Sequence, residues 1–426
     1  YVFRATSTPS PTDVTACYYT NEAWLSTLPS FVRAWRGPIS LVFEAAHSRT
    51  SPLRSSLIST ISTLRSSDHL IRENVDFHIV GAPPSLSERS LNKTRERMIF
   101  NPIAMNYHIN LARFFAPTDV VFIVGDARIT PSVGLRNRLG SESVRTLVLE
   151  KGDAVVVPTF GFVRDRSGES ATSRLPTVND LRAELDLPEG GAWDGVGEDE
   201  FAAIAEKNLH STLATLPLAR PQWPKTKASI TSLVSTRVGT IEAPTTAVLA
   251  LFDKGWDLNH GPTNWYLWRK SSTDPRLLES PDLGGGVGLG VGGGVGGGGE
   301  VFRVTDYDLH YSPLVVVSRK GQPWCTERFE NMHAACVYQM YLSGAEMWIL
   351  PDEWAVTVEG TEKVAVSVKE DPAQKLKNSI SSRLYGKFHQ EACMHYGREF
   401  LSVQMWDSDK AQHLRQVCAR TLGTWG

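Results

Sequence analysis

The residues with the clearest chemical potential follow an apolar run, at Gly125-Asp126-Ala127-Arg128. The run at 120–124 predicts a buried strand, which places the acid at the carboxyl end of that strand. Open α/β sheets bind their ligands at this edge. A carboxylate there can ligate a cation, and a guanidinium can pair with a phosphate through two parallel hydrogen bonds. The alternative for Asp126 is a structural cap on the turn that follows.

Alternating strands and helices must position this motif. Apolar runs predict strands at 14–19, 39–45, 75–80, 120–124 and 154–158. Helical spacing between them predicts helices at 24–35, 56–65 and 101–115. This alternation favours an α/β fold with a parallel sheet and right-handed crossovers. Later segments predict strands at 313–317 and 347–351, and helices at 338–342, 371–385 and 408–422.

Composition excludes several classes of protein. The 426 residues are 41% hydrophobic and 21% charged, which is normal for a globular protein. A formal charge of −2 gives no electrostatic footprint for nucleic acid. The five cysteines lack CxxC spacing, which argues against structural zinc and allows at most two internal disulfides. No apolar run reaches the length of about 18 residues that spans a bilayer.

The glycine-rich stretch 284–299 matches GxGxxG, as almost any such run does. No apolar strand leads into it, so it is not a dinucleotide-binding fingerprint. We expect a flexible loop inserted into a domain. The chain also has no Walker P-loop, which weakens the hypothesis of another kind of nucleotide-binding α/β enzyme.

Several separated stretches occur in an order that resembles one known family. They are 35–40 (WRGPIS), Asn106 with Asn110, Ala112 and Arg113, 260–265 (HGPTNW) with Trp268, 311–317 (YSPLVVV), 327–329 (ERF) and 348–351 (WILP). The family is the family 49 glycosyltransferases, the LARGE-type glucuronyltransferase group. One departure is Ile109, which stands where the family's helix has an arginine. The resemblance covers roughly residues 13–358, with interruptions near 164–250 and 275–300.

The resemblance implies a GT-A-type nucleotide-sugar transferase fold, with a mostly parallel central sheet flanked by helices. The expected domain spans 13–358, with 284–299 as its flexible insertion, and a helical extension at 359–426 packs on it. The implied activity is inverting transfer of a sugar from a UDP-sugar to a glycan or glycoprotein acceptor. The implied location is the secretory pathway, in the Golgi lumen, as a type II membrane protein whose anchor is absent from this chain.

The metal-binding motif departs from the family pattern. The family's Asp-x-Asp holds a divalent cation on the donor diphosphate, but here the second carboxylate is replaced by Arg128. The family's late histidine would fall near Thr357. One carboxylate, Asp126, rarely suffices to hold Mn²⁺, so a metal is doubtful. Three alternatives remain: Arg128 neutralises the diphosphate itself, transfer activity is lost and a binding subunit remains, or Arg128 makes a salt bridge or lies at the surface.

The resemblance also places donor-binding residues beside Asp126 and Arg128. Thr20 and Asn21 follow the first strand, where a GT-A enzyme contacts the nucleotide base. A polar turn at this position is the structural alternative.

A general base is required to take the proton of the acceptor hydroxyl. The candidates are Glu330 and Glu327, with Asp352 and Glu353 as second choices. We prefer Glu330, because it follows the Arg-Phe pair into a turn. A solvated acid is the alternative for each of them.

Acceptor-binding residues are expected at His260, Asn264 and Trp265. The indole of Trp265, together with that of Trp268, can stack on a sugar ring, but their spacing also suits two core residues. For His260 and Asn264 the alternative is a proline-containing loop with a hydrogen-bonded histidine.

Overall fold

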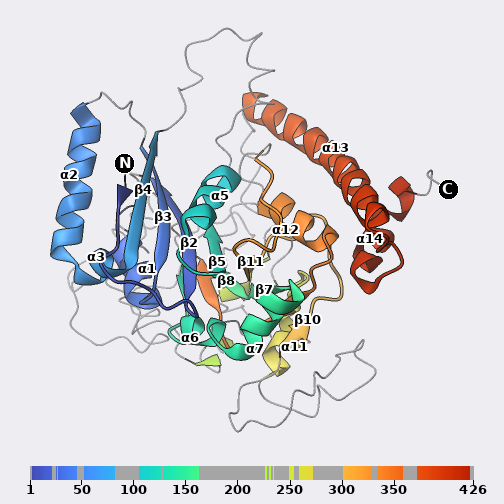
Figure 1. Ribbon diagram of the computed structural model, residues 1–426, viewed down its shortest axis with the longest axis horizontal. Helices are drawn as coiled ribbons and strands as arrows, with labels where there is room; N and C mark the ends of the chain where they lie inside the picture. The colour runs from blue at the N-terminus through green and yellow to red at the C-terminus, as the bar shows by residue number, and fades with distance from the viewer. Residues whose placement is uncertain are drawn as a thin grey trace, which may run out of the picture.

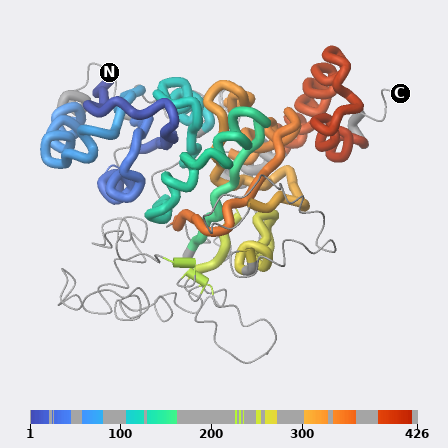
Figure 2. Tube along the Cα trace, turned by 60° about the horizontal axis from the view of Figure 1, so that its bottom comes forward, coloured from blue at the N-terminus to red at the C-terminus, as the bar shows by residue number. Residues whose placement is uncertain are grey.

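The computed structural model describes residues 2–21, 25, 27–45, 52–81, 105–125, 129–162, 226–227, 230–231, 234, 249–253, 259–271, 301–327, 333–357 and 372–422. Figures 1 and 2 show their arrangement. Several predictions fall outside these ranges: the motif 126–128, Glu330, and the glycine-rich stretch 284–299.

A nine-stranded sheet forms the centre of the protein, in the order β1-β4-β3-β2-β5-β11-β7-β12-β10. The strands are β1 (Val2–Phe3), β2 (Val14–Asn21), β3 (Ile39–Ala45), β4 (Val75–Gly81), β5 (Val120–Gly125), β7 (Ala154–Val157), β10 (Phe302–Arg303), β11 (Leu314–Ser318) and β12 (Met347–Ile349). The architecture is therefore α/β, as predicted.

The expectation of a mostly parallel sheet was wrong, because the sheet is mixed. Pairs β2–β3, β3–β4, β2–β5 and β7–β12 are parallel. Pairs β1–β4, β5–β11, β7–β11 and β10–β12 are antiparallel. The apolar run of β11 could not reveal its direction, since a central strand buried on both faces has the same composition either way.

Two hydrophobic cores cover the two faces of the sheet. Alternate residues of β5 point to opposite faces: Val121 and Ile123 join one core, while Val120 and Phe122 join the other. Helix α5 (Met105–Phe115) packs on the first face, and α1 (Leu28–Trp35) packs on the second. Helices α2 (Pro52–Ser67) and α3 (His69–Asn74) connect β3 to β4 (Figure 1). Burial on both sides explains why β5 is apolar throughout.

A smaller sheet continues from the carboxyl ends of the larger one. Its order is β6-β13-β8-β9, from β6 (Ile129–Pro131), β13 (Ala355–Thr357), β8 (Thr159–Phe162) and β9 (Leu249–Leu251). Along the chain, β6 follows β5, β8 follows β7 and β13 follows β12. The small sheet therefore adjoins the edge at which these three strands end.

The C-terminal helices pack on α12 (His333–Leu342). They are α13 (Pro372–Ser402) and α14 (Gln412–Leu422), and a third core joins them to α12. A disulfide between Cys393 and Cys418 links the two helices. Helix α13 runs well beyond the predicted end at residue 385. Figure 2 shows this helical pair far from the N-terminal strands.

Candidate functional site

The strand order reverses between β2 and β5, and two of the predicted donor residues, Thr20 and Asn21, lie there. From β2 the chain adds β3 and then β4 on one side, and it returns to add β5 on the other. Ligands of open α/β sheets bind outside the carboxyl ends of the strands at such a switch point. Tyr18 lies opposite Gly125, so Thr20 and Asn21 extend past the end of β5. Gly125 has φ +77°, a conformation that favours glycine.

Asp126 and Arg128 lie outside the described residues. The residues on either side of them, Gly125 and Ile129, belong to β5 and β6. Ile129 pairs with Thr357 of β13. The position at which the family's histidine was expected therefore lies next to this connection, and it holds a buried threonine.

A cluster of three polar side chains at this edge was missed by sequence reasoning. The Tyr19 hydroxyl donates to Glu44 Oε2 at 2.6 Å, and His108 Nε2 lies 3.7 Å from the same oxygen. The His108 ring stacks on Tyr19, with 4.5 Å between ring centroids. Burial lowers the pKa of His108, and the Glu44 carboxylate acts in the opposite direction. The available signal in the sequence was Glu44, the only charged residue in a mostly apolar strand.

His108 Nδ1 is buried and has no hydrogen-bond partner among the described residues. Buried polar atoms are normally paired. The Tyr19 and Glu44 contacts also fix the orientation of α5, because they place its N-terminal end at the carboxyl edge of β2 and β3.

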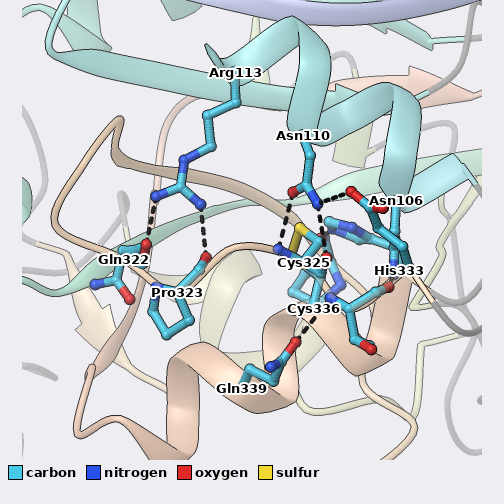
Figure 3. The surroundings of a disulfide bond; sticks show 12 residues. Asn106, Asn110, Arg113, Gln322, Pro323, Cys325, His333, Cys336 and Gln339 are labelled. Atoms are coloured by element: carbon cyan, nitrogen blue, oxygen red, sulfur yellow. Dashed lines mark hydrogen bonds between the residues drawn. A yellow bond between two sulfur atoms is a disulfide. The ribbon is translucent and has the colours of Figure 1, made fainter.

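Helix α5 holds the segment 318–327 through one buried arginine (Figure 3). Arg113 is fully buried and donates to the carbonyl oxygens of Ser318, Arg319, Gln322 and Pro323 at 2.6–3.1 Å. Burial lowers the pKa of Arg113 to about 10, so the side chain stays charged at neutral pH. These four bonds satisfy the carbonyl of Ser318, at the end of β11, and three carbonyls in the irregular segment that follows it.

Two asparagines continue this contact toward the N-terminal end of α5. Asn110 Oδ1 accepts from Cys325 N at 2.9 Å, and its Nδ2 donates to Cys325 O at 2.8 Å and to Glu327 Oε1 at 2.9 Å. Asn106 Nδ2 donates to Thr326 O at 2.7 Å. A disulfide from Cys325 to Cys336 ties the segment to α12 (Figure 3). The segment thus runs along α5 and brings Glu327 to the carboxyl edge.

The structure thereby places one predicted base, Glu327, at the same edge as Thr20. The preferred base, Glu330, lies outside the described residues. The next described residue is His333. Its Nε2 atom lies 2.9 Å from the carbonyl oxygen of Pro313, the residue directly before β11. Of the second choices, Glu353 accepts a hydrogen bond from the Ser132 hydroxyl and lies in the connection between β12 and β13.

The predicted acceptor segment is the loop 259–264, which is held by hydrogen bonds to the buried carboxylate of Asp253. This buried carboxylate accepts from Thr263 N at 2.8 Å and Thr263 Oγ1 at 2.5 Å, and Thr263 Oγ1 lies 2.8 Å from the Tyr311 hydroxyl. Burial raises the pKa of Asp253 to about 6. A Cβ at Gly261 would lie 2.2 Å from Asp253 Oδ2, so the loop approaches the carboxylate too closely for a side chain.

This loop lies at the carboxyl edge as well. Tyr311 precedes β11, whose first residue Leu314 pairs with Val157 at the end of β7. A cavity of about 240 Å³ opens on the loop, and His260, Asn264, Tyr266 and Asp306 are among its lining residues. We call it the Tyr266 pocket. Two predicted acceptor residues, His260 and Asn264, therefore line one cavity.

The third predicted acceptor residue, Trp265, belongs to the core. Its side chain is 1% exposed and its ring stacks on Trp268, with 5.7 Å between centroids. Trp268 is also buried and donates its indole N–H to Leu350 O at 3.0 Å. Direct stacking of Trp265 on a sugar is thus corrected in favour of the core alternative. The exposed aromatic ring is Tyr266, because the first turn of α11 (Trp265–Lys270) points that residue outward.

The described residues contain no group of three or more His, Cys, Asp or Glu side chains that could hold a metal ion. None of the helices in the described part of the chain is long and apolar enough to cross a membrane. Two disulfides are present and Cys17 is buried and unpaired, within the limit set by five cysteines.

The chain matches no protein-family model and no curated protein. Functional assignment therefore rests on the site itself.

Proposed function

We propose that this protein is an inverting glycosyltransferase that moves a sugar from a UDP-sugar to a glycan or glycoprotein acceptor. The proposal rests on three features built on the large sheet. These are the switch point beside Thr20 and Asn21, the segment that delivers Glu327, and the Tyr266 pocket. A transferase needs these three functions together: a donor site, a base and an acceptor site.

The strand arrangement supports a GT-A-type fold for this site. The parallel strands β4-β3-β2-β5 form a nucleotide-binding half, and β11, β7 and β12 with the small sheet form the second half. The sequence blocks that resemble family 49 enzymes fall in both halves. Asn106, Asn110 and Arg113, which resemble the family's helix residues, all contact the segment 318–327.

The transfer would proceed by a single displacement. The acceptor hydroxyl oxygen attacks the anomeric carbon, and the bond from that carbon to the diphosphate oxygen breaks as UDP leaves with the electron pair. The proton of the hydroxyl passes to a carboxylate, for which Glu330 and Glu327 are the proposed bases. Asn110 occupies one oxygen of Glu327, so this residue can also act by holding the segment in place.

The residues present do not fit the family's Mn²⁺ site. An arginine stands at the second aspartate, and the threonine paired with Ile129 stands near the expected histidine. We therefore derive no step through a metal. Arg128 is proposed to pair with the diphosphate instead, since its guanidinium stays charged and binds phosphate oxygens bidentately.

Two disulfides are consistent with the secretory location implied by the resemblance, because such bonds persist in oxidising compartments. We propose this location together with the activity.

Calorimetry with UDP tests the donor site. Wild-type protein is expected to bind UDP equally well with Mn²⁺ and with EDTA. Arg128→Ala is expected to weaken binding at least tenfold, because a hydrogen-bonded charge pair is lost. Arg33→Ala is the matched control, since this arginine is exposed in a salt bridge with Asp68 on the surface. Absence of UDP binding under both conditions would overturn the proposal.

A further inference from the structure

The Tyr266 pocket has the size and the chemistry of a site for one sugar ring. Its volume of about 240 Å³ is slightly below the roughly 300 Å³ at which pockets for drug-sized ligands begin. Tyr266 is 43% exposed and offers an aromatic face, and the carboxylate of Asp306 lines the same cavity. An aromatic face beside a polar group suits a pyranose, which has an apolar face and a rim of hydroxyls.

Asn264 adds a hydrogen-bond donor. Its Oδ1 accepts from Leu267 N at 3.1 Å, which fixes the side chain as the cap of α11. The Nδ2 group of Asn264 carries two donor hydrogens, whereas the Asp306 carboxylate can only accept hydrogen bonds. A sugar hydroxyl both donates and accepts, so it can satisfy both groups.

The charge of the pocket distinguishes between kinds of sugar. Asp306 contributes a negative charge, and the described lining residues include neither lysine nor arginine. An anionic ring, such as a uronic acid, would meet a like charge without a fixed cation to balance it. The pocket therefore favours a neutral sugar.

The loop that forms the pocket is held in place before any ligand arrives. Asp253 fixes Thr263, and Asn259 Oδ1 accepts from Leu251 N at 2.8 Å. Asn259 and Asn264 have φ values of 65° and 54°, conformations that are costly for residues other than glycine. A preformed site loses little entropy when its ligand binds.

We propose that the Tyr266 pocket is the acceptor subsite for a neutral pyranose, in which Tyr266 stacks on the ring and Asp306 excludes acidic sugars. The role of the pocket as an acceptor subsite rests on the proposed function. The binding of a neutral sugar in the pocket can be tested independently of that function. It assigns the stacking role to Tyr266 in place of Trp265.

Saturation-transfer NMR with four methyl β-glycosides tests the inference on the full chain. The probes are the galactoside, the xyloside, the N-acetylglucosaminide and the glucuronide. We expect at least one neutral probe to bind and the glucuronide to bind more weakly. Tyr266→Ala should weaken binding of the neutral probe about fivefold to tenfold, because ring stacking is lost. Phe114→Ala is the matched control, since its ring is exposed at the other end of α5 and should leave binding unchanged.

Asp306→Asn supplies the second variant, because Asp306 is exposed and the substitution removes its charge while keeping the size of the side chain. We expect this variant to bind the glucuronide more tightly than wild type does. The inference is overturned if no neutral probe binds, if binding survives Tyr266→Ala, or if wild type does not discriminate against the glucuronide.

Parallel UDP calorimetry separates this inference from the proposed function. UDP binding without glycoside binding would overturn the subsite and leave the transferase proposal standing. Glycoside binding through Tyr266 without UDP binding would retain a sugar-binding pocket and overturn the transferase proposal.

Discussion

Individual side chains at the candidate site divide into residues that shape it and residues that face a ligand. Asp253 is of the first kind, since its carboxylate is enclosed and bonded to Thr263. Tyr266 and Asp306 are of the second kind, because both are exposed on the pocket. Sequence reasoning expected His260 and Asn264 on the acceptor side, and the structure places both on one cavity. It could not decide between adjacent aromatic residues, because that depends on how α11 is rotated.

The raised pKa of Asp253 makes a specific prediction about stability. Its pKa is about 6 in the folded chain, above the ordinary value of an aspartate, so the folded state holds this proton more tightly. The group therefore stabilises the fold fully below about pH 4, and this contribution is lost as the pH rises through about 6. The loss should be on the order of 3 kcal/mol.

Urea unfolding of wild type and Asp253→Asn from pH 4 to pH 7 measures this contribution. The difference in unfolding free energy, wild type minus variant, should fall across that interval. Parallel pH dependences for the two proteins would contradict the assignment of a raised pKa.

Helix α5 is the element on which the site depends most. One of its ends approaches Glu44, and its buried polar face holds the segment that carries Glu327. Arg113 is the centre of this contact, because four carbonyl oxygens would lose their partner without it.

Arg113→Met should therefore destabilise the protein by about 3–5 kcal/mol, the cost of breaking a fully buried polar network. Arg33→Met removes an exposed salt bridge and should change stability by no more than about 0.5 kcal/mol. Urea unfolding at one pH compares the two. Equal effects would show that the segment does not depend on Arg113.

The positions of strands and helices were predictable from the sequence where every residue of the element is buried. They were not predictable where the burial of the element depends on contacts with distant parts of the chain. Strands β2 to β5 were placed within two residues, because continuous apolar runs bounded by polar turns define them. The antiparallel direction of β11 was not visible, since it depends on the path of the chain before it. The length of α13 was underestimated, because a narrow buried stripe on a polar helix gives a weak periodic signal. The cluster of Tyr19, Glu44 and His108 unites three elements, so sequence spacing could not show it.

At the scale of the whole molecule, the proposed donor, base and acceptor features are all built on the large sheet. The two halves of the large sheet meet at β5 and β11, and the small sheet extends the same edge. The C-terminal helices pack on α12, which a disulfide connects to the segment bearing Glu327. We propose that this part of the molecule transfers a sugar from a UDP-sugar.

The most direct measurement is release of UDP from a panel of UDP-sugars, in the presence of the neutral glycosides that bind. We predict turnover above background with at least one donor, retained with EDTA and reduced at least a hundredfold by Glu330→Gln, since general base catalysis contributes about 10²–10⁴-fold. Phe114→Ala should turn over as wild type does. Absence of turnover with every donor would contradict the account and leave a catalytically inactive binding protein of the same fold.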